Sequence, residues 1–226
     1  KILKGNGSLY WAGGMRYGWD NYIKNQKFDL LFVYNDDTQL FMDALRNLIH
    51  AYNESFNKYK NEPIIVVGSC LSSCKKFTTY GGQLLLAGFN PLRFKRCDPD
   101  KSLIMSIDTL NMNCALINNE CLVKFGFLAK YFPHSMADFE YGLRVKKKNG
   151  NIILAKSYHG ICDRNNDLSY KSLSNASDYL RWITSIKNNT ILPFFKFYRE
   201  YGGIFWFLHF IKIYFNKIFL KLLLKL

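Results

Sequence analysis

The stretch that decides the fold is Phe28-Asp-Leu-Leu-Phe-Val-Tyr34, followed directly by Asn35-Asp-Asp-Thr38. The first seven residues form a nearly continuous apolar run without alternation, which is typical of a strand covered on both faces in a parallel sheet. After the polar stop, Phe41, Leu45 and Leu48 recur at helical spacing. The acidic residues are therefore expected on a strand-to-helix connection, at the edge where open α/β sheets bind ligands.

The other hydrophobic patterns complete an alternating arrangement of strands and helices. Strands are predicted at residues 63–68, 82–86, 103–107 and 151–155, and helices at residues 14–24 and 136–148. Between residues 70 and 96 the pattern weakens into Gly, Ser, Thr and basic residues, which indicates a hairpin with loops. The expected fold is α/β, with a mixed, mostly parallel sheet flanked by helices. We expect one domain over residues 1–190 and an amphipathic helical tail over residues 191–226.

The composition is strongly basic. Among 226 residues, 31 Lys and Arg stand against 17 Asp and Glu, a formal net charge of +14. Polyanionic surfaces attract such a protein, so nucleic acid, anionic lipid and phosphorylated substrates are all candidate partners. The six cysteines show no disulfide framework and no CxxC pair, so we expect reduced thiols in a cytosolic protein. The sequence contains no run of eighteen uncharged apolar residues, which is about the length that could span a bilayer.

Asp36 and Asp37 are the first candidates for chemistry. Adjacent carboxylates at the end of a buried strand are hard oxygen ligands suited to Mg²⁺ or Mn²⁺, which could bridge to a diphosphate. The structural alternative is that one of them caps the following helix, near the positive end of its dipole.

The glycine-rich opening from Gly5 to Gly18 is the second candidate. Its glycines precede and begin a predicted helix, where backbone N–H groups could meet a phosphate or a sugar. It is not GxGxxG, which disfavours a dinucleotide oxidoreductase. The structural alternative is a tight turn with close helix packing, in which Trp11 and Met15 fill the core.

Four motifs occur in a fixed order along the chain. They are Asn6-Gly7, Trp11-Ala-Gly-Gly-Met15, Tyr34-Asn-Asp-Asp-Thr38 and His134-Ser-Met-Ala-Asp-Phe-Glu-Tyr-Gly-Leu-Arg144. In combination, from about Lys4 to Arg164, the sequence resembles bacterial family 2 glycosyltransferases, in particular the rhamnosyltransferase-like group. The resemblance implies a GT-A-like (Rossmann-like) fold and an inverting transferase with a nucleotide-sugar donor and Mg²⁺ or Mn²⁺ as cofactor.

The resemblance also implies a role for each motif. The segment from Asn35 to Asp37 corresponds to the DxD-type motif, with Asp37 as a metal ligand and Asp36 beside the donor. Asp138 matches the base that takes the proton of the acceptor hydroxyl. The expected site residues are Asp138 as catalytic base; Asn6, Gly13, Gly14, Asn35 and Asp36 at the donor; Asp36, Asp37 and His159 at the metal; and Trp11 and Glu140 on the acceptor side.

Structural alternatives remain open for three of these residues. Asp138 would also suit the first turn of a helix as a favourable charge. Glu140 points in a different direction from Asp138 and would pair with Arg144, four residues on. A lone histidine such as His159, placed just after the strand that ends near Ala155, is more often structural.

Members of the resembled family normally carry a first strand, a helix and an acidic strand end upstream of the segment that begins at Lys1. Those elements hold the nucleotide base. The resemblance therefore implies that the catalytic domain is N-terminally incomplete, with sheet edges open to pairing and an incomplete donor pocket.

From Ile191 onward, aromatic and aliphatic residues are interrupted every few positions by Lys or Arg. Lys217, Lys221 and Lys225 recur at four-residue spacing and would line one face of a helix lying in an anionic membrane interface. The alternative is that the helix packs on its own domain or on a partner. A membrane-facing enzyme would suit a saccharide or lipid-linked acceptor in bacterial surface polysaccharide synthesis, working in the cytoplasm on the inner face of the plasma membrane.

Two rival functions remain. A nucleic-acid-binding module would use the basic and aromatic side chains, but it leaves the acidic cluster without a role, so no nucleic acid is expected as a partner. A non-catalytic membrane or assembly protein would keep the fold without the donor site.

Overall fold

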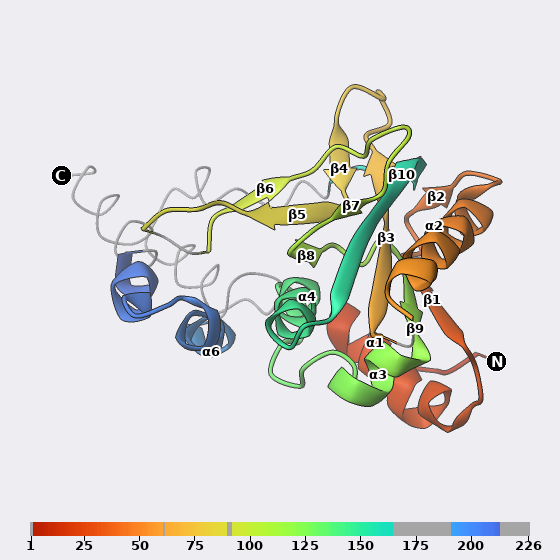
Figure 1. Cartoon of the computed structure of the whole chain (residues 1–226). Coiled ribbons are helices and arrows are strands. Elements are labelled where there is room, and N and C mark those ends of the chain that lie inside the picture. The colour runs from red at the N-terminus through yellow and green to blue at the C-terminus, as the bar shows by residue number, and fades with distance from the viewer. Residues whose placement is uncertain (1, 61, 90–91, 165–190, 213–226) are drawn as a thin grey trace.

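The computed structural model describes residues 2–60, 62–89, 92–164 and 191–212 as a mixed α/β fold (Figure 1). The helices are α1 (Tyr10–Asn21), the short 3-10 helix η1 (Ile23–Asn25), α2 (Ala44–Lys58), α3 (Asn119–Phe125), α4 (Ala137–Lys147) and α6 (Ile191–Tyr201). The strands are β1 (Leu30–Tyr34), β2 (Gln39–Leu40), β3 (Ile64–Leu71), β4 (Thr78–Tyr80), β5 (Gly82–Leu85), β6 (Phe94–Arg96), β7 (Met105–Ser106), β8 (Thr109–Leu110), β9 (Cys114–Asn118) and β10 (Asn151–Ile161).

The large sheet has the strand order β1-β9-β3-β10-β2, with β4 beside β3 and β7 beside β10. Within the described residues, β3 and β10 form the one parallel pair, and all other pairs are antiparallel. The expectation of a mostly parallel sheet is therefore wrong. A continuous apolar run indicates burial but does not fix the direction of the neighbouring strand, and β9 enters antiparallel between β1 and β3.

The expectation that β1 is buried on both faces also fails. In the described part of the chain β1 pairs with β9 alone, so it forms an edge of the sheet. Only Val33 of the strand is buried, and Tyr34 is exposed. The central positions belong instead to β3, which is buried at seven of its eight residues.

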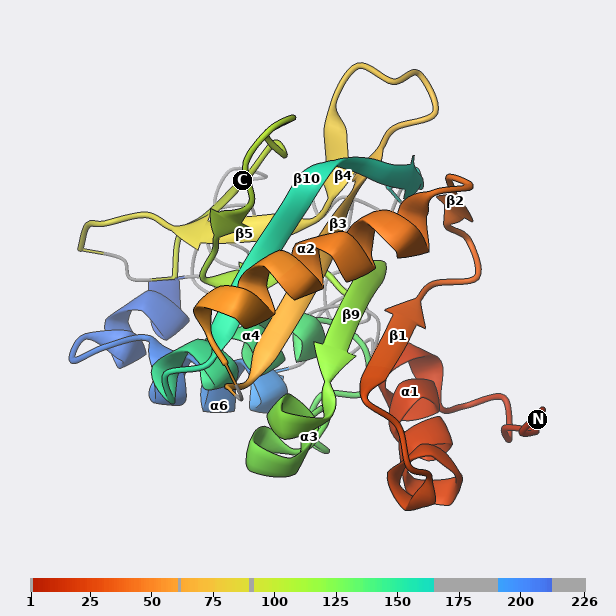
Figure 2. The same cartoon turned by 45° about the vertical axis from the view of Figure 1, so that its right-hand side comes forward.

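Two hydrophobic clusters lie on opposite faces of the large sheet. Along β3, Ile65 and Val67 contribute to the larger cluster, while Ile64 and Val66 contribute to the smaller one. This alternation follows from the two-residue period of a strand. Helix α2 lies across the face of the smaller cluster (Figure 2). Its buried residues are Ala44, Leu48, Ala51 and Ser55, spaced as one helical stripe.

The predicted elements are present with shifted boundaries. The helix expected at residues 136–148 is α4, and the strand expected at residues 63–68 is β3. The strand expected at residues 103–107 is reduced to the two residues of β7. The strand expected to end near residue 155 continues to Ile161 through register shifts, so His159 lies inside β10 rather than after it.

Helix α6 packs on the domain through one face. Phe194, Phe197 and Tyr198 are buried in the larger cluster. For this face the alternative of packing on the chain's own domain is confirmed. Lys217, Lys221 and Lys225, which carry the prediction of an interfacial helix, lie outside the described residues. Among the described helices, none is long and apolar enough to cross a membrane.

All six cysteines are free, and five of them are buried, as expected for reduced thiols. Burial raises the pKa of the Cys114 and Cys121 thiols to about 12 in each case. These side chains therefore act as small apolar groups in the core.

Candidate active site

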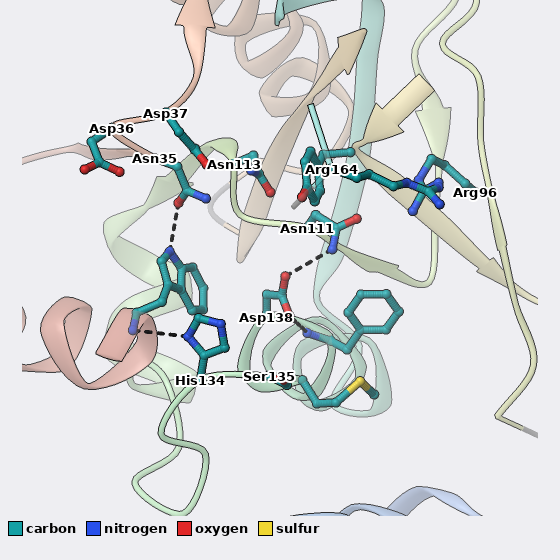
Figure 3. Close-up of a pocket in the computed structure, with 14 residues that line it drawn as sticks. Asn35, Asp36, Asp37, Arg96, Asn111, Asn113, His134, Ser135, Asp138 and Arg164 are labelled. Atoms are coloured by element: carbon teal, nitrogen blue, oxygen red, sulfur yellow. Dashed lines mark hydrogen bonds between the residues drawn. The ribbon is translucent and has the colours of Figure 1, made fainter. Parts of the chain in front are cut away.

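A polar pocket of about 550 Å³ opens beside the end of β1 (Figure 3). Its walls come from α1, the β1–β2 connection, β4, β6, the β8–β9 connection, the loop before α4, the first turn of α4 and the chain after β10. The lining residues are Trp11, Asn35, Asp36, Asp37, Tyr80, Arg96, Asn111, Asn113, His134, Ser135, Met136, Asp138, Phe139 and Arg164. Five predicted site residues thus meet in one place: Trp11, Asn35, Asp36, Asp37 and Asp138.

The acidic end of the pocket is built on the turn that follows β1. The backbone N–H of Asn35 donates to the carbonyl of Asn113, at 3.2 Å, which ties this turn to the loop before β9. The Asn35 side chain accepts a hydrogen bond from Nε1 of Trp11, at 2.8 Å. Asp36 and Asp37 are exposed, and Oδ1 of Asp37 accepts from Sγ of Cys162 at 3.6 Å. The turn is therefore fixed while both carboxylates remain accessible.

The alternative role of these aspartates as helix caps is wrong. Helix α2 begins at Ala44, and its N-cap residue is Asp43. Strand β2 lies between the acidic pair and the helix. Neither Asp36 nor Asp37 is thus near enough to the helix start to satisfy its first N–H groups.

Asp138 occupies the first turn of α4, on the opposite wall of the pocket. Its Oδ2 accepts from Nδ2 of Asn111 at 3.2 Å, and its Oδ1 accepts from the N–H of Phe139 at 2.9 Å. Burial raises the pKa of this carboxyl above its ordinary value, against the opposing effect of these hydrogen bonds. A carboxylate with a raised pKa is a stronger base, which suits proton abstraction from a hydroxyl group.

The loop before α4 connects the walls of the pocket. The backbone N–H of Trp11 donates to Nδ1 of His134 at 3.4 Å, and the N–H of Gly13 donates to the carbonyl of Pro133 at 3.3 Å. Met136, the residue before α4, has a left-handed backbone with φ 66°. These contacts attach α1 to the segment that presents Asp138.

The opposite end of the pocket is basic. Arg96 closes β6 and Arg164 follows the end of β10, and both line the cavity. Figure 3 shows them on the side away from Asp36 and Asp37, with Asp138 between the two ends. Neither arginine was among the site residues expected from the sequence. Their signal is weak, because isolated cations in a protein with 31 Lys and Arg do not stand out.

Three predicted donor residues do not line this pocket. Asn6 is exposed and accepts hydrogen bonds from Ser8. The N–H of Gly13 is already used by Pro133, so it is not available to a phosphate. Gly14 lines a separate apolar groove of about 230 Å³ between α1 and β1. The structural alternative holds only in part: Trp11 and Met15 pack against the larger hydrophobic cluster, but a Cβ at Gly14 would meet nothing within 4 Å, so this glycine does not provide a close helix contact.

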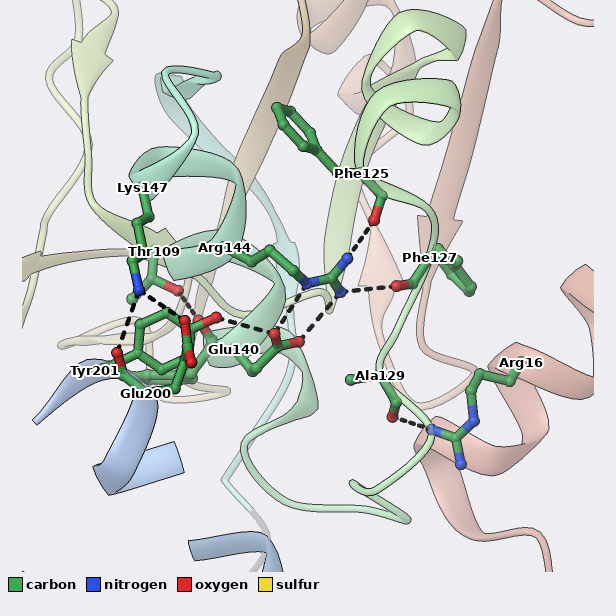
Figure 4. A network of polar contacts seen from close by, with 11 residues as sticks. Arg16, Thr109, Phe125, Phe127, Ala129, Glu140, Arg144, Lys147, Glu200 and Tyr201 are labelled. Carbon is green, nitrogen blue, oxygen red and sulfur yellow. Dashed lines mark hydrogen bonds and ion pairs between the residues drawn. The ribbon is translucent and has the colours of Figure 1, made fainter. Parts of the chain in front are cut away.

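Glu140, predicted on the acceptor side, is buried in a different part of the structure (Figure 4). Its Oε1 accepts from Nε of Arg144 at 2.9 Å and from the hydroxyl of Tyr201 at 3.0 Å. Arg144 also donates to the carbonyls of Phe125 and Phe127. The pairing of Glu140 with Arg144, four residues on, is confirmed, and it links α4 to α6 and to the chain after α3.

His159, predicted at the metal, is fully buried and does not line the pocket. Its ring packs against Gly68 on the side of the sheet near Cys114. Burial lowers the pKa of its imidazole to about 4, and neither ring nitrogen has a hydrogen-bond partner within the described residues. His159 thus lies outside the lining of the pocket to which Asp37 contributes, and its burial favours a structural histidine.

In the part of the chain that the structure describes, no group of three or more His, Cys, Asp or Glu side chains is arranged to hold a metal ion. The acidic end nevertheless fits one kind of cation site. Mg²⁺ is commonly held by one or two carboxylates together with the phosphate oxygens of a substrate. Asp36 and Asp37 could supply that many ligands, and a diphosphate could supply others.

Comparison with known proteins gives no family assignment, since no family model matches the sequence and no curated protein matches it. The fold and the site geometry define the chain as a mixed α/β protein with a polar pocket that is acidic at one end and basic at the other.

Proposed function

We propose that this protein is an inverting glycosyltransferase that moves a sugar from a nucleotide-sugar donor to a saccharide or lipid-linked saccharide acceptor. The observation that carries the proposal is the meeting of Asp36 and Asp37 with Asp138 in one pocket, although about a hundred residues separate them in sequence. The resemblance assigns these residues to metal binding and to base catalysis. A metal site for the donor and a base for the acceptor must face the same pocket, and these residues line one pocket.

In the proposed reaction the acceptor lies beside Asp138. The hydroxyl oxygen of the acceptor attacks the anomeric carbon of the donor sugar from the face opposite the diphosphate. A new C–O bond forms between acceptor and sugar, and the bond between the sugar and the diphosphate oxygen breaks. Asp138 takes the hydroxyl proton, while Asn111 holds its carboxylate in place at 3.2 Å. General base catalysis of this kind contributes about 10²–10⁴-fold to the rate.

Asp36 and Asp37 would hold the divalent cation. When bound, Mg²⁺ or Mn²⁺ would supply positive charge that stabilises the departing nucleoside diphosphate. The hydrogen bond from Trp11 to Asn35 keeps the acidic turn in position for this task.

A GT-A-like fold belongs to this proposal. The parallel pair β3 and β10, covered by α2 on one face and contacted by α4, supports it. The position of β1 at a sheet edge, with the acidic turn at its end, is compatible with further strands beyond β1.

Peripheral association with an anionic membrane surface is the second part of the proposal. Between α4 and α6 lies a groove of about 670 Å³ whose lining includes the cations Lys147, Lys148, Lys196 and Arg199. The chain that follows α6 exposes large apolar side chains, namely Ile204, Phe205, Phe207, Leu208 and Ile211. The combination of a cationic groove and exposed apolar side chains would suit the interface of an anionic bilayer, where a lipid-linked acceptor would be found.

The test of the donor site is a titration of the full-length protein with a panel of nucleoside diphosphates, with and without Mn²⁺. We expect Mn²⁺-dependent binding of one nucleotide, lost in Asp37→Ala. The matched control is Asp20→Ala, which removes an exposed carboxylate on α1 that forms an ion pair with Lys24 at the surface and does not line the pocket. Asp138→Asn should keep nucleotide binding and lose sugar transfer. Absence of nucleotide binding in the parent would overturn the catalytic proposal.

A further inference from the structure

Arg96 and Arg164 bring two guanidinium groups to one end of the pocket from different parts of the fold. Arg96 is the last residue of β6, whose backbone is fixed opposite Gln83 of β5 in the small sheet. Arg164 comes three residues after the end of β10 in the large sheet. Both line the pocket, and Figure 3 shows both side chains on the side of Asn111 away from Asp37.

Neither arginine forms an ion pair within the described residues. The acidic residues next to them in sequence have other partners. Asp98 accepts a hydrogen bond from the hydroxyl of Thr78, and Asp163 accepts one from the N–H of Ser73 at 2.8 Å. The Nε of Arg96 is buried and has no hydrogen-bond partner in the described structure.

This arrangement is unfavourable unless an anion completes it. Like charges at one end of a cavity repel each other, and a buried donor without an acceptor has lost its hydration without compensation. Guanidinium groups present several N–H donors in a planar fork, which matches the paired oxygens of a phosphate or a carboxylate. Both arginines would be satisfied by one oxyanion between them.

We propose that Arg96 and Arg164 form a subsite for an anionic group, a phosphate or a carboxylate, carried by the acceptor. The assignment to the acceptor rests on the proposed function, which places the donor diphosphate at Asp36 and Asp37. Asp138 lies between the two ends, so a molecule held by the arginines can present a hydroxyl to this base. The substrate class is therefore an acidic or phosphate-bearing saccharide rather than a neutral one.

The test begins with calorimetric titration of the full-length protein with inorganic phosphate and, separately, with acetate, in the absence of metal and nucleotide. We expect the parent to bind phosphate, and Arg96→Gln and Arg164→Gln each to weaken that binding by about tenfold or more. The controls are Arg46→Gln and Arg93→Gln as single variants, because each removes one positive charge, as the test variants do, from an exposed position that does not line the pocket. Phosphate binding with weak acetate binding would identify a phosphate-bearing acceptor, and comparable binding of both a carboxylate-bearing one.

Three results would overturn the proposal. The first is absence of phosphate binding in the parent, and the second is phosphate affinity that falls equally in the control variants. The third is loss of Mn²⁺-dependent nucleotide binding in the two arginine variants, which would assign the subsite to the donor. Since the phosphate titration uses neither metal nor nucleotide, its outcome is separate from the test of the donor site. Circular dichroism of each variant verifies that the fold is intact.

Discussion

Glu140→Gln should be one of the most destabilising single-atom changes in the described fold. Glu140 is only 2% exposed, and its carboxylate accepts from Nε and Nη2 of Arg144 at 2.9 and 3.2 Å. It also accepts from the hydroxyl of Tyr201 on α6. The amide of glutamine keeps one acceptor oxygen but turns an NH₂ group toward donors, and it leaves the guanidinium without a counter-charge (Figure 4).

The size of the effect follows from burial. Breaking a buried ion pair by removing one charge costs about 3–5 kcal/mol, because the remaining charge is uncompensated. The same network contains an exposed pair, Lys147 with Glu200 at 2.7 Å, whose side chains are 57% and 54% exposed. An exposed pair contributes only about 0–1 kcal/mol. Glu200→Gln is therefore a matched control for the same chemical change.

The measurement is the free energy of unfolding from urea titration at pH 7 for the parent and both variants, followed by circular dichroism. We expect a loss of about 3 kcal/mol or more for Glu140→Gln and less than about 1 kcal/mol for Glu200→Gln. Equal losses would refute the reasoning, since burial would then not govern the cost. Loss of sugar transfer in Glu140→Gln with unchanged stability would restore Glu140 to the acceptor side of the site.

Three further predictions follow from burial, packing and exposure. Burial lowers the pKa of the His159 imidazole from 6.5 to about 4, so as the pH falls the unfolded chain binds a proton before the folded protein does. The free energy of unfolding should therefore drop by about 3 kcal/mol between pH 7 and 4. This part of the pH dependence should be missing in His159→Gln. Gly142→Ala would place its Cβ 2.8 Å from the backbone of β8 and should lower the free energy of unfolding, measured by urea titration, by about 1–3 kcal/mol. Gly14→Ala is the control, because its Cβ would meet nothing within 4 Å, and it should not lower the free energy of unfolding. Equal effects of the two changes would contradict the packing argument. Ile204→Asn should weaken binding to phosphatidylglycerol vesicles, measured by cosedimentation, by about tenfold. Val123→Asn on α3, which also changes an exposed apolar residue, should leave this binding unchanged. Unchanged vesicle binding of the Ile204 variant would argue against membrane contact through this segment.

Periodicity in the sequence located most of the helices and strands but misjudged their partners. The pattern at residues 136–148 led to α4 within one residue at each end, because its apolar stripe and charged face fit a helix. Cys114–Asn118 was not predicted, although it supplies strand β9, which lies between β1 and β3. Four apolar residues followed by an asparagine form too short a pattern to separate a strand from a loop, and only pairing with β1 and β3 determines their role.

For the candidate site too, the sequence located some residues and misplaced or omitted others. Asp36, Asp37 and Asp138 were found because each lies in a motif, and the structure brings all three to one pocket. His159 was placed wrongly beside the strand end, because polar residues and register shifts conceal the continuation of β10. Arg96 was not found, since nothing in a three-residue strand indicates that its side chain lines the pocket.

By itself, the sequence determined the α/β class, the positions of the main helices and strands, and the acidic turn after β1, because hydrophobic period and strand-end polarity are local properties of the chain. Tertiary structure alone decided the antiparallel insertion of β9, the burial of His159 and Glu140, and the pairing of an acidic with a basic end in one pocket. These features depend on contacts between residues far apart in the sequence, such as Asp37 and Cys162. Local patterns do not encode such contacts, because strand direction and burial are set by whichever segments pack together once the chain has folded.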